Sequence, residues 1–325
     1  MEKHKTLDII IIQRDIIDKT KITLNELKTL FKLLKKNTIK IIFDIDDDLL
    51  NIDKTHVEYE RYTKLKTTLE FLISKSDLIT VSTKFLKQQL DKYNNNIIII
   101  PNTLMKLWDY PYNKNIKKLK SKEKIKIGYF GTRSHGNDLL LIKTAISNVR
   151  NQIKKEIIVE TIGVCHENHD WINQISMPNN YKDNPTIKDN MKNSLQYILN
   201  KFNIMPPSLP YCNFIKWIKN ETDWDIGIAP LENNNINRSK SNLKYLEYTA
   251  LNIPCIYSNI GPYKEIREKN TGIVVNNTTN EWENALINLI ENYELYETII
   301  KNAQKDVENN YLVKNASLIW KQILK

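Results

Sequence analysis

The segment IGYFGTRSHGNDLLLIKTAI, residues 127–146, has the pattern of a strand, a glycine-containing turn and a helix. A turn of this kind offers backbone N–H groups and the positive end of a helix to a diphosphate. Gly131 and Thr132 would allow close backbone approach there. Arg133 would add a bidentate contact, and His135 follows in the same turn. Because the spacing is not GxGxxG, a purely structural turn explains the segment equally well.

Glycine is confined to the C-terminal part of the chain. All seven glycines lie beyond residue 127, and the first 127 residues contain none. A nucleotide phosphate held by backbone N–H groups needs close backbone approach, which a Cβ hinders. We therefore expect any nucleotide site to belong to the second part of the chain.

Short apolar runs alternate with helical patterns on both sides of this segment. The expected strands cover 7–12, 40–43, 77–82, 96–100, 126–130, 157–163, 224–229, 254–258 and 272–275. The expected helices cover 22–36, 62–72, 83–93, 138–151, 191–202 and 242–251, with more from 281 onward. Strands that are apolar on both faces predict parallel sheets covered on both sides.

The length of 325 residues predicts two α/β domains, because single cores usually stop growing near about 250–300 residues. We expect an N-terminal Rossmann-like domain at 1–112, a basic linker at 113–126 and a second Rossmann-like domain at 127–305. A C-terminal helical segment would follow at 306–325 and return toward the first domain. Two such domains in tandem predict a cleft between the carboxyl ends of two facing sheets.

The composition is that of an ordinary globular chain. With 41% hydrophobic and 26% charged residues, disordered and collagen-like classes are excluded. No apolar run approaches the roughly 18 residues of a membrane helix, and Asp8 interrupts the opening apolar patch, which excludes a secretory signal. The three cysteines lack CxxC spacing, which excludes a disulfide scaffold and a zinc ribbon. We expect a cytoplasmic protein.

The net charge of +10 is concentrated near the N-terminus. Residues 1–120 carry 23 Lys and Arg against 16 Asp and Glu, and residues 121–325 carry 25 against 22. A basic face suits phosphate-bearing partners, and peripheral contact with an anionic inner membrane surface is one expectation. A solvated lysine-rich surface explains the same imbalance. No nucleic-acid-binding module is recognisable, so we expect no nucleic acid partner.

A second informative segment is APLENNNINRSKSNLKYLEYTALNIPCIYSNIGPYKEI, residues 229–266. Ser241 is a suitable N-cap for a helix with Lys244 in its first turn and Glu247 in its second. A cation near a helix N-terminus opposes the dipole, which hints at a bound anion. Glu247 is offset from the apolar face, and it is either an exposed helix residue or a clamp for a ribose diol.

These segments, with the closing pattern GIVVNNTTNEWENALINLI, resemble the donor-binding domain of family-four-like glycosyltransferases of the GT-B fold, of the surface-polysaccharide kind. DIIIIQR, IIFDIDDDLL, DLITVSTKFL and IIIIPN resemble the first, acceptor-side domain of the same enzymes. The resemblance implies a nucleoside-diphosphate sugar as donor substrate, no further cofactor, no metal, and retention of configuration. The implied donor-binding residues are Gly131, Thr132, Arg133, Arg238, Asn242, Lys244 and Glu247, with Glu247 holding the ribose hydroxyls.

Two departures from the family pattern keep alternatives open. The family's pair of glutamates separated by seven residues is incomplete, because Ser239 stands at the first position. The chain also begins almost at the strand of DIIIIQR, so the first domain is expected to be trimmed at its edge. A non-catalytic nucleotide-sugar-binding subunit of a transferase and a sugar-nucleotide epimerase of the same fold are the alternatives to a glycosyltransferase.

The acidic turn after Phe43 has several interpretations. An aspartyl-phosphate phosphatase begins with a similar hhhhDxD motif, and clustered carboxylates also suit Mg²⁺ or Mn²⁺. A cleft-facing turn that positions an acceptor, or a structural cap, is the alternative. The acceptor-side candidates are Gln13, Arg14, Asp47 and Asp48. The catalytic candidates are Arg133, Lys244 and Asp46.

Overall fold

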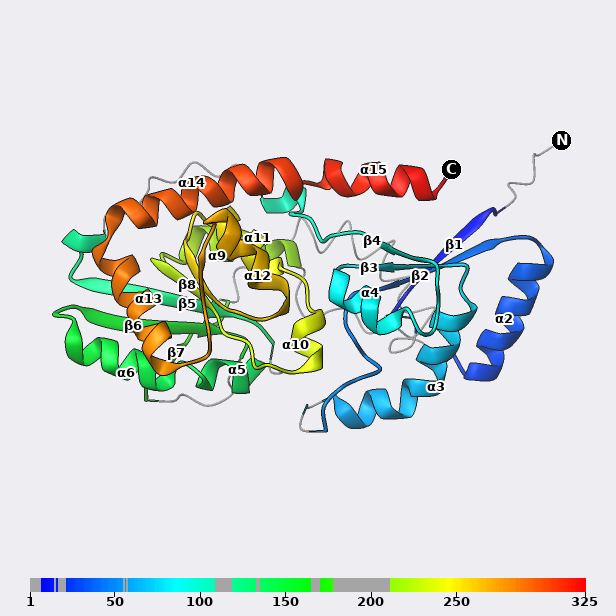
Figure 1. The fold of residues 1–325 in the computed structure, drawn as a ribbon, viewed down its shortest axis with the longest axis horizontal. Coiled ribbons are helices and arrows are strands. Elements are labelled where there is room, and N and C mark those ends of the chain that lie inside the picture. The colour runs from blue at the N-terminus through cyan, green and yellow to red at the C-terminus, as the bar shows by residue number, and fades with distance from the viewer. Residues whose placement is uncertain are drawn as a thin grey trace.

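The computed structural model describes residues 7–14, 16, 22–54, 56, 58–108, 119–132, 135–164, 170–177 and 211–325. Its strands form two parallel sheets, one in each part of the chain (Figure 1). No helix in these ranges is long and apolar enough to cross a membrane. The predicted α/β class with two Rossmann-like units is confirmed.

The first sheet has the order β1-β2-β3-β4, and each neighbouring pair is parallel. Its strands are β1 (Ile9–Gln13), β2 (Lys40–Ile45), β3 (Leu78–Val81) and β4 (Ile97–Ile99). The helices α2 (Leu24–Lys36), α3 (Tyr59–Lys75) and α4 (Lys84–Leu90) share one hydrophobic core with these strands. Helix α2 begins with a capping box between Thr23 and Glu26, which satisfies two orphan N–H groups.

The second sheet has the order β10-β9-β8-β5-β6-β7 and is also parallel. Its strands are β5 (Lys124–Phe130), β6 (Glu156–Ile162), β7 (Asn173–Gln174), β8 (Ile226–Ala229), β9 (Cys255–Ser258) and β10 (Ile273–Val275). The surrounding helices are α5 (Gly136–Leu140), α6 (Lys143–Gln152), α9 (Tyr211–Glu221), α10 (Asn235–Ser239), α11 (Leu243–Ala250), α12 (Lys264–Lys269), α13 (Thr279–Glu291) and α14 (Tyr293–Asn310). Short 3-10 turns η1 (Lys106–Trp108), η2 (Leu119–Ser121) and η4 (Gly261–Tyr263) connect them.

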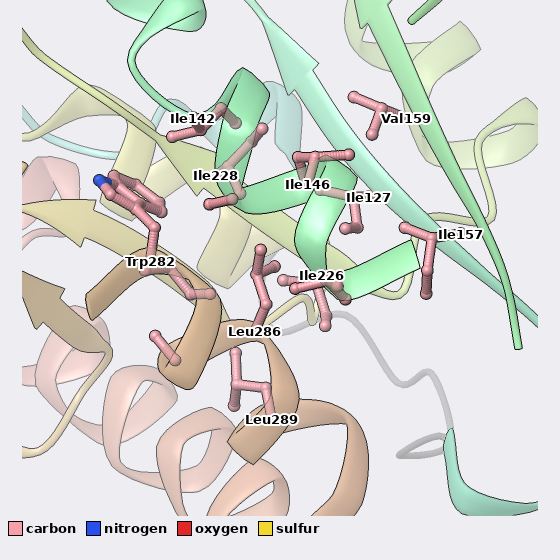
Figure 2. Close-up of a cluster of buried hydrophobic side chains, with 14 of the residues drawn as sticks. Ile127, Ile142, Ile146, Ile157, Val159, Ile226, Ile228, Trp282, Leu286 and Leu289 are labelled. Atoms are coloured by element: carbon pink, nitrogen blue, oxygen red, sulfur yellow. The ribbon is translucent and has the colours of Figure 1, made fainter. Parts of the chain in front are cut away.

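Both faces of the second sheet are covered. Figure 2 shows one face, where Ile127 and Ile226 of the strands meet Ile146 of α6 and Trp282 and Leu286 of α13. All five side chains are fully buried. Helices α9 and α11 contribute to a separate core on the other face. This double burial is why the strands read as continuous apolar runs rather than alternating ones.

The C-terminal helix α15 (Val313–Ile323) crosses to the first sheet, as predicted (Figure 1). Ile323 packs with Ile42 of β2 and Leu78 of β3, on the face of the sheet opposite α2 and α3. The Nζ of Lys40 donates to the carbonyl of Ile323 at 3.2 Å. Helix α15 therefore adds to the hydrophobic packing of the N-terminal domain.

Some element boundaries differ from expectation. Strand β5 begins at Lys124, inside the segment expected to be a linker, because Lys124 and Lys126 pair with acidic residues on neighbouring segments. Strand β2 extends to Ile45, so Asp44 is part of the sheet. The helix expected at 138–151 is divided into α5 and α6. The helix expected at 191–202 lies outside the described residues.

Candidate functional site

A cavity of about 610 Å³ lies between the two domains, where strands of both sheets end. Arg14 follows β1, Asp47 follows β2 and Thr132 follows β5, and all three line the cavity. Ile236 and Lys240, from α10 and the residue after it, line the second-domain side. The carboxyl ends of parallel strands are where ligands bind in open α/β folds, so this cavity is the candidate ligand site.

Lys240 is a cation on the second-domain side of this cavity. It is half-buried and belongs to a polar chain that ends at the buried Asp138. Its Nζ lies 2.9 Å from Nε2 of His135, and Nδ1 of His135 lies 2.7 Å from Oδ2 of Asp138. Burial lowers the pKa of Lys240, and the carboxylates of Asp47 and Asp138 oppose that shift. Burial also lowers the pKa of His135, which favours the neutral ring.

Asp138 connects the turn after β5 with the loop between β8 and α10 through hydrogen bonds. Its Oδ1 accepts from the backbone N–H of Glu232 at 2.6 Å and from the side chain of Asn237 at 2.9 Å. Its other oxygen contacts His135 in the turn after β5. The residue is 3% exposed, and three donors satisfy its buried charge. One carboxylate therefore fixes the β5–α5 turn relative to the β8–α10 loop.

Glu247 is buried, not exposed, and it has two partners. Its Oε2 lies 3.0 Å from Nζ of Lys244, and its Oε1 accepts from the hydroxyl of Tyr211 at 2.8 Å. The Lys244 ammonium also lies 3.8 Å from the centre of the Phe130 ring, a cation–π distance. This internal pairing already offsets the cost of a cation near the start of α11. Neither Lys244 nor Glu247 lines the cavity.

Ser239 joins the two domains. Its buried Oγ accepts from the backbone N–H of Asp48 at 3.1 Å and donates to the carbonyl of Ile236 at 2.7 Å. Its own carbonyl accepts from the hydroxyl of Thr83 at 2.9 Å. The carboxylate of Asp48 is buried and binds the amide of Asn51 at 2.9 Å. Asp48 therefore contributes to the domain interface. Contrary to expectation, it lines neither the large cavity nor the smaller one beside Gln13.

The other acceptor-side candidates gather at the first-domain side of the cleft. Arg14 forms ion pairs with Asp46 at 3.1 Å and with Asp47 at 2.5 Å. A second cavity of about 300 Å³ is lined by Gln13, Arg14 and Asp46, among others. Burial and, next, the neighbouring charge of Asp47 raise the pKa of Asp46 to about 6. This side of the cleft is therefore acidic and polar.

The structure does not show the remaining donor-side candidates at the wall of the large cavity. Arg238 directs its Nε to Oδ1 of Asn233 at 2.8 Å and lines neither cavity. The N–H of Gly131 donates to the carbonyl of Ile162 at 3.0 Å, so it is used within the sheet. Arg133 lies outside the described residues.

The start of α11 differs from expectation. Asn242, not Ser241, occupies the N-cap position, and its side chain makes no capping hydrogen bond. The hydroxyl of Ser241 instead accepts from the amide of Asn102 in the first domain at 2.7 Å. Leu243, the first residue of α11, is 42% exposed. The loop before α11 is thus shaped by contact with the first domain rather than by helix capping.

Sequence reasoning missed the role of Lys240 and Asp138. Lys240 lies in the same RSKS segment as Arg238, so its positive charge in that loop was the sequence signal that could have identified it as a ligand-binding candidate. His56, Arg61 and Tyr62 of the first domain also line the large cavity without having been singled out. Among the residues described, no group of three or more His, Cys, Asp or Glu side chains is arranged to hold a metal ion.

Comparison with solved structures identifies the fold. Sucrose-phosphate synthase from Thermosynechococcus elongatus is 13% identical with a TM-score of 0.60, and the match covers 97% of this chain and 72% of that one. HepE from Anabaena, solved with UDP and glucose, is 11% identical with a TM-score of 0.59, covering 98% and 77%. A glycosyltransferase from Rickettsia africae is 17% identical with a TM-score of 0.55, covering 100% and 84%.

No protein-family model matches the chain, and no curated protein matches it. The likeness to solved structures extends over nearly the whole chain at low sequence identity. The chain therefore has the GT-B fold, with two parallel-sheet domains around a cleft.

Proposed function

We propose that the protein transfers a sugar from a nucleoside-diphosphate sugar to a glycan, lipid-linked or protein acceptor. The observation that carries the proposal is the interdomain cavity of about 610 Å³, lined by residues after strands of both sheets and by the half-buried Lys240. HepE, which shares the fold, was solved with UDP and with UDP-glucose. UDP and its sugars are therefore the first donors to test.

In the proposed reaction, negative charge develops on the departing diphosphate. Preorganised cations and N–H groups stabilise such charge most effectively, because they need not reorganise during the reaction. Lys240 is a cation on the second-domain side of the cavity, Thr132 lines the same cavity, and Arg133 follows Thr132 in sequence. We propose that these groups replace a metal ion, and that the reaction retains anomeric configuration.

The proposed acceptor site is the first-domain side of the cleft. Gln13, Arg14, Asp46 and Asp47 lie there around the two adjoining cavities. Carboxylates and an amide suit hydrogen bonds to acceptor hydroxyl groups. Asp46 is the group placed to accept such a bond once it is ionised.

A thermal-shift panel tests the donor. Because a ligand that binds only the native state raises stability by RT ln(1 + [L]/Kd), UDP should raise the melting temperature, and sugars of UDP should raise it too. A product assay with and without candidate acceptors tests transfer. Absence of a shift with every nucleoside diphosphate would contradict the proposal.

A non-catalytic nucleotide-sugar-binding subunit is the second candidate, and Ser239 favours it. Its hydroxyl donates to the carbonyl of Ile236 and accepts from the N–H of Asp48. A serine at this position also supplies no carboxylate that could bind a donor sugar. Such a subunit would bind the nucleotide sugar without turning it over. An epimerase would convert the donor without any acceptor, so the same product assay separates all three functions.

We also propose weak contact with anionic membranes through α2. Lys28, Lys32 and Lys36 recur every fourth residue along its exposed side, next to Leu33, which is 58% exposed. Near a surface each lysine contributes about 1 kcal/mol, or about fivefold in binding. Changing all three to glutamine should weaken binding to phosphatidylglycerol vesicles about 100-fold, whereas the same change at Lys301, Lys305 and Lys314 should not. Equal binding to neutral vesicles would contradict this.

A further inference from the structure

We propose that Asp138 and His135 are positioning residues that hold the Lys240 ammonium at the cavity wall for an anionic ligand. The proposal rests on the proposed function, in which that anion is the diphosphate of the donor. The three side chains come from α5, from the residue before it and from the loop after α10. The contacts of 2.7 Å and 2.9 Å join them into one continuous chain.

The chemistry of the end groups fixes the protonation of the histidine. The ionised carboxylate of Asp138 only accepts hydrogen bonds, and the ammonium of Lys240 only donates them. His135 must therefore donate from Nδ1 and accept at Nε2, which requires the neutral ring with its proton on Nδ1. A protonated ring would present an N–H to the ammonium and would lose that contact.

Asp138 and His135 are each held by contacts outside the chain. The backbone of Glu232 and the side chain of Asn237 hold the carboxylate of Asp138. The ring of Tyr129 lies edge-on to the ring of His135, with centroids 6.5 Å apart. The Nε2 atom of His135 is therefore a fixed acceptor, and its hydrogen bond restricts the rotamer of Lys240. A charge that is already in place costs less reorganisation when a ligand arrives.

Other charged groups around Lys240 explain why positioning matters. Asp47 of the first domain attracts the ammonium, whereas Lys244 and Arg14 repel it. Asp47 lines the same cavity from across the cleft. A lysine free to move would be drawn toward Asp47 and would be neutralised there. The neutral acceptor on His135 holds the ammonium without cancelling its charge.

Two conservative variants separate positioning of Lys240 from support of Asp138. In His135→Asn the amide nitrogen lies near the place of Nδ1, so the bond to Asp138 is kept and the acceptor for Lys240 is lost. In His135→Gln the carbonyl oxygen lies near the place of Nε2, so the acceptor is kept and the bond to Asp138 is lost. We expect UDP affinity, measured by calorimetry, to fall about 10-fold or more in His135→Asn and less than about threefold in His135→Gln.

The reverse order, or wild-type affinity in both variants, would overturn the proposal. Melting temperatures of both variants exclude a general loss of structure. If the wild-type protein binds no nucleoside diphosphate, the proposed function fails, and ¹⁵N shifts of the His135 ring decide the positioning proposal alone. A protonated Nδ1, with an Nε2 signal that moves in Lys240→Met, supports it. A protonated Nε2, or an Nε2 signal unchanged in Lys240→Met, overturns it.

Discussion

Lys244 and Glu247 should couple far more strongly than a pair on an exposed helix surface. Their charged atoms lie 3.0 Å apart, and the side chains are only 21% and 8% exposed. At an effective dielectric constant of about 20, the Coulomb attraction at this separation is about 5 kcal/mol, much of which offsets desolvation. We expect a net coupling energy of about 1–3 kcal/mol, against about 0.2–0.5 kcal/mol for an exposed helical pair.

A double-mutant cycle with Lys244→Met and Glu247→Gln measures this coupling by urea unfolding. Glutamine keeps an acceptor for the hydroxyl of Tyr211, so the cycle isolates the charge pair. Each single variant should lower the free energy of unfolding, because it leaves one buried charge without its partner. The double variant should recover part of the loss. A coupling energy below about 0.5 kcal/mol would refute the reasoning and would mean that the pair is solvated.

Other consequences can be tested separately. Glu247→Gln should lower UDP affinity about 10-fold or more by calorimetry if the carboxylate also holds the ribose, and unchanged affinity would remove that role. Gly163→Ala should cost about 1–3 kcal/mol in urea unfolding, because φ is +77° and the new Cβ would lie 2.4 Å from the carbonyl oxygen of Gly131. Gly136→Ala, whose Cβ would meet nothing within 4 Å, is the matched control and should not destabilise. The raised pKa of Asp46, about 6, means that the folded state keeps this proton to higher pH than the unfolded state, so the free energy of unfolding should fall as pH rises from about 4 to about 6. Asp46→Asn should lack this component, and an identical pH profile in both proteins would contradict it. Sugar transfer should survive EDTA, and loss of transfer that Mn²⁺ restores would return the Asp46–Asp48 turn to consideration as a ligand set.

Much of the fold was predictable because it depends on local patterns. The apolar runs of β1, β3, β8 and β9 are continuous, since helices cover both faces of their sheets, and each was expected within two residues of its observed bounds. Strand β5 was harder. The lysines Lys124 and Lys126 flank the buried Ile125 at its start, and their ion pairs with Glu156 and Asp223 explain how lysines are accommodated in a strand there.

The candidate site was predictable only in outline. The two loops after β5 and β8 were identified, yet the residue that lines the cavity is Lys240 rather than Arg238. Lys240 contacts His135 across 105 residues of sequence, and no local spacing encodes such a contact. Glu247 was matched by resemblance, but its burial depends on Tyr211 and Lys244, which pattern reasoning does not reveal.

The most direct test of the account is the affinity for UDP of the wild-type protein and of Lys240→Met, measured by calorimetry. Lys301→Met is the matched control, because that lysine is 61% exposed on α14 and lies outside the cavity. The wild type and Lys301→Met should bind UDP equally, and Lys240→Met should bind it about 10- to 150-fold more weakly with an unchanged melting temperature. Equal binding by Lys240→Met and the wild type, or no binding by the wild type, would contradict it.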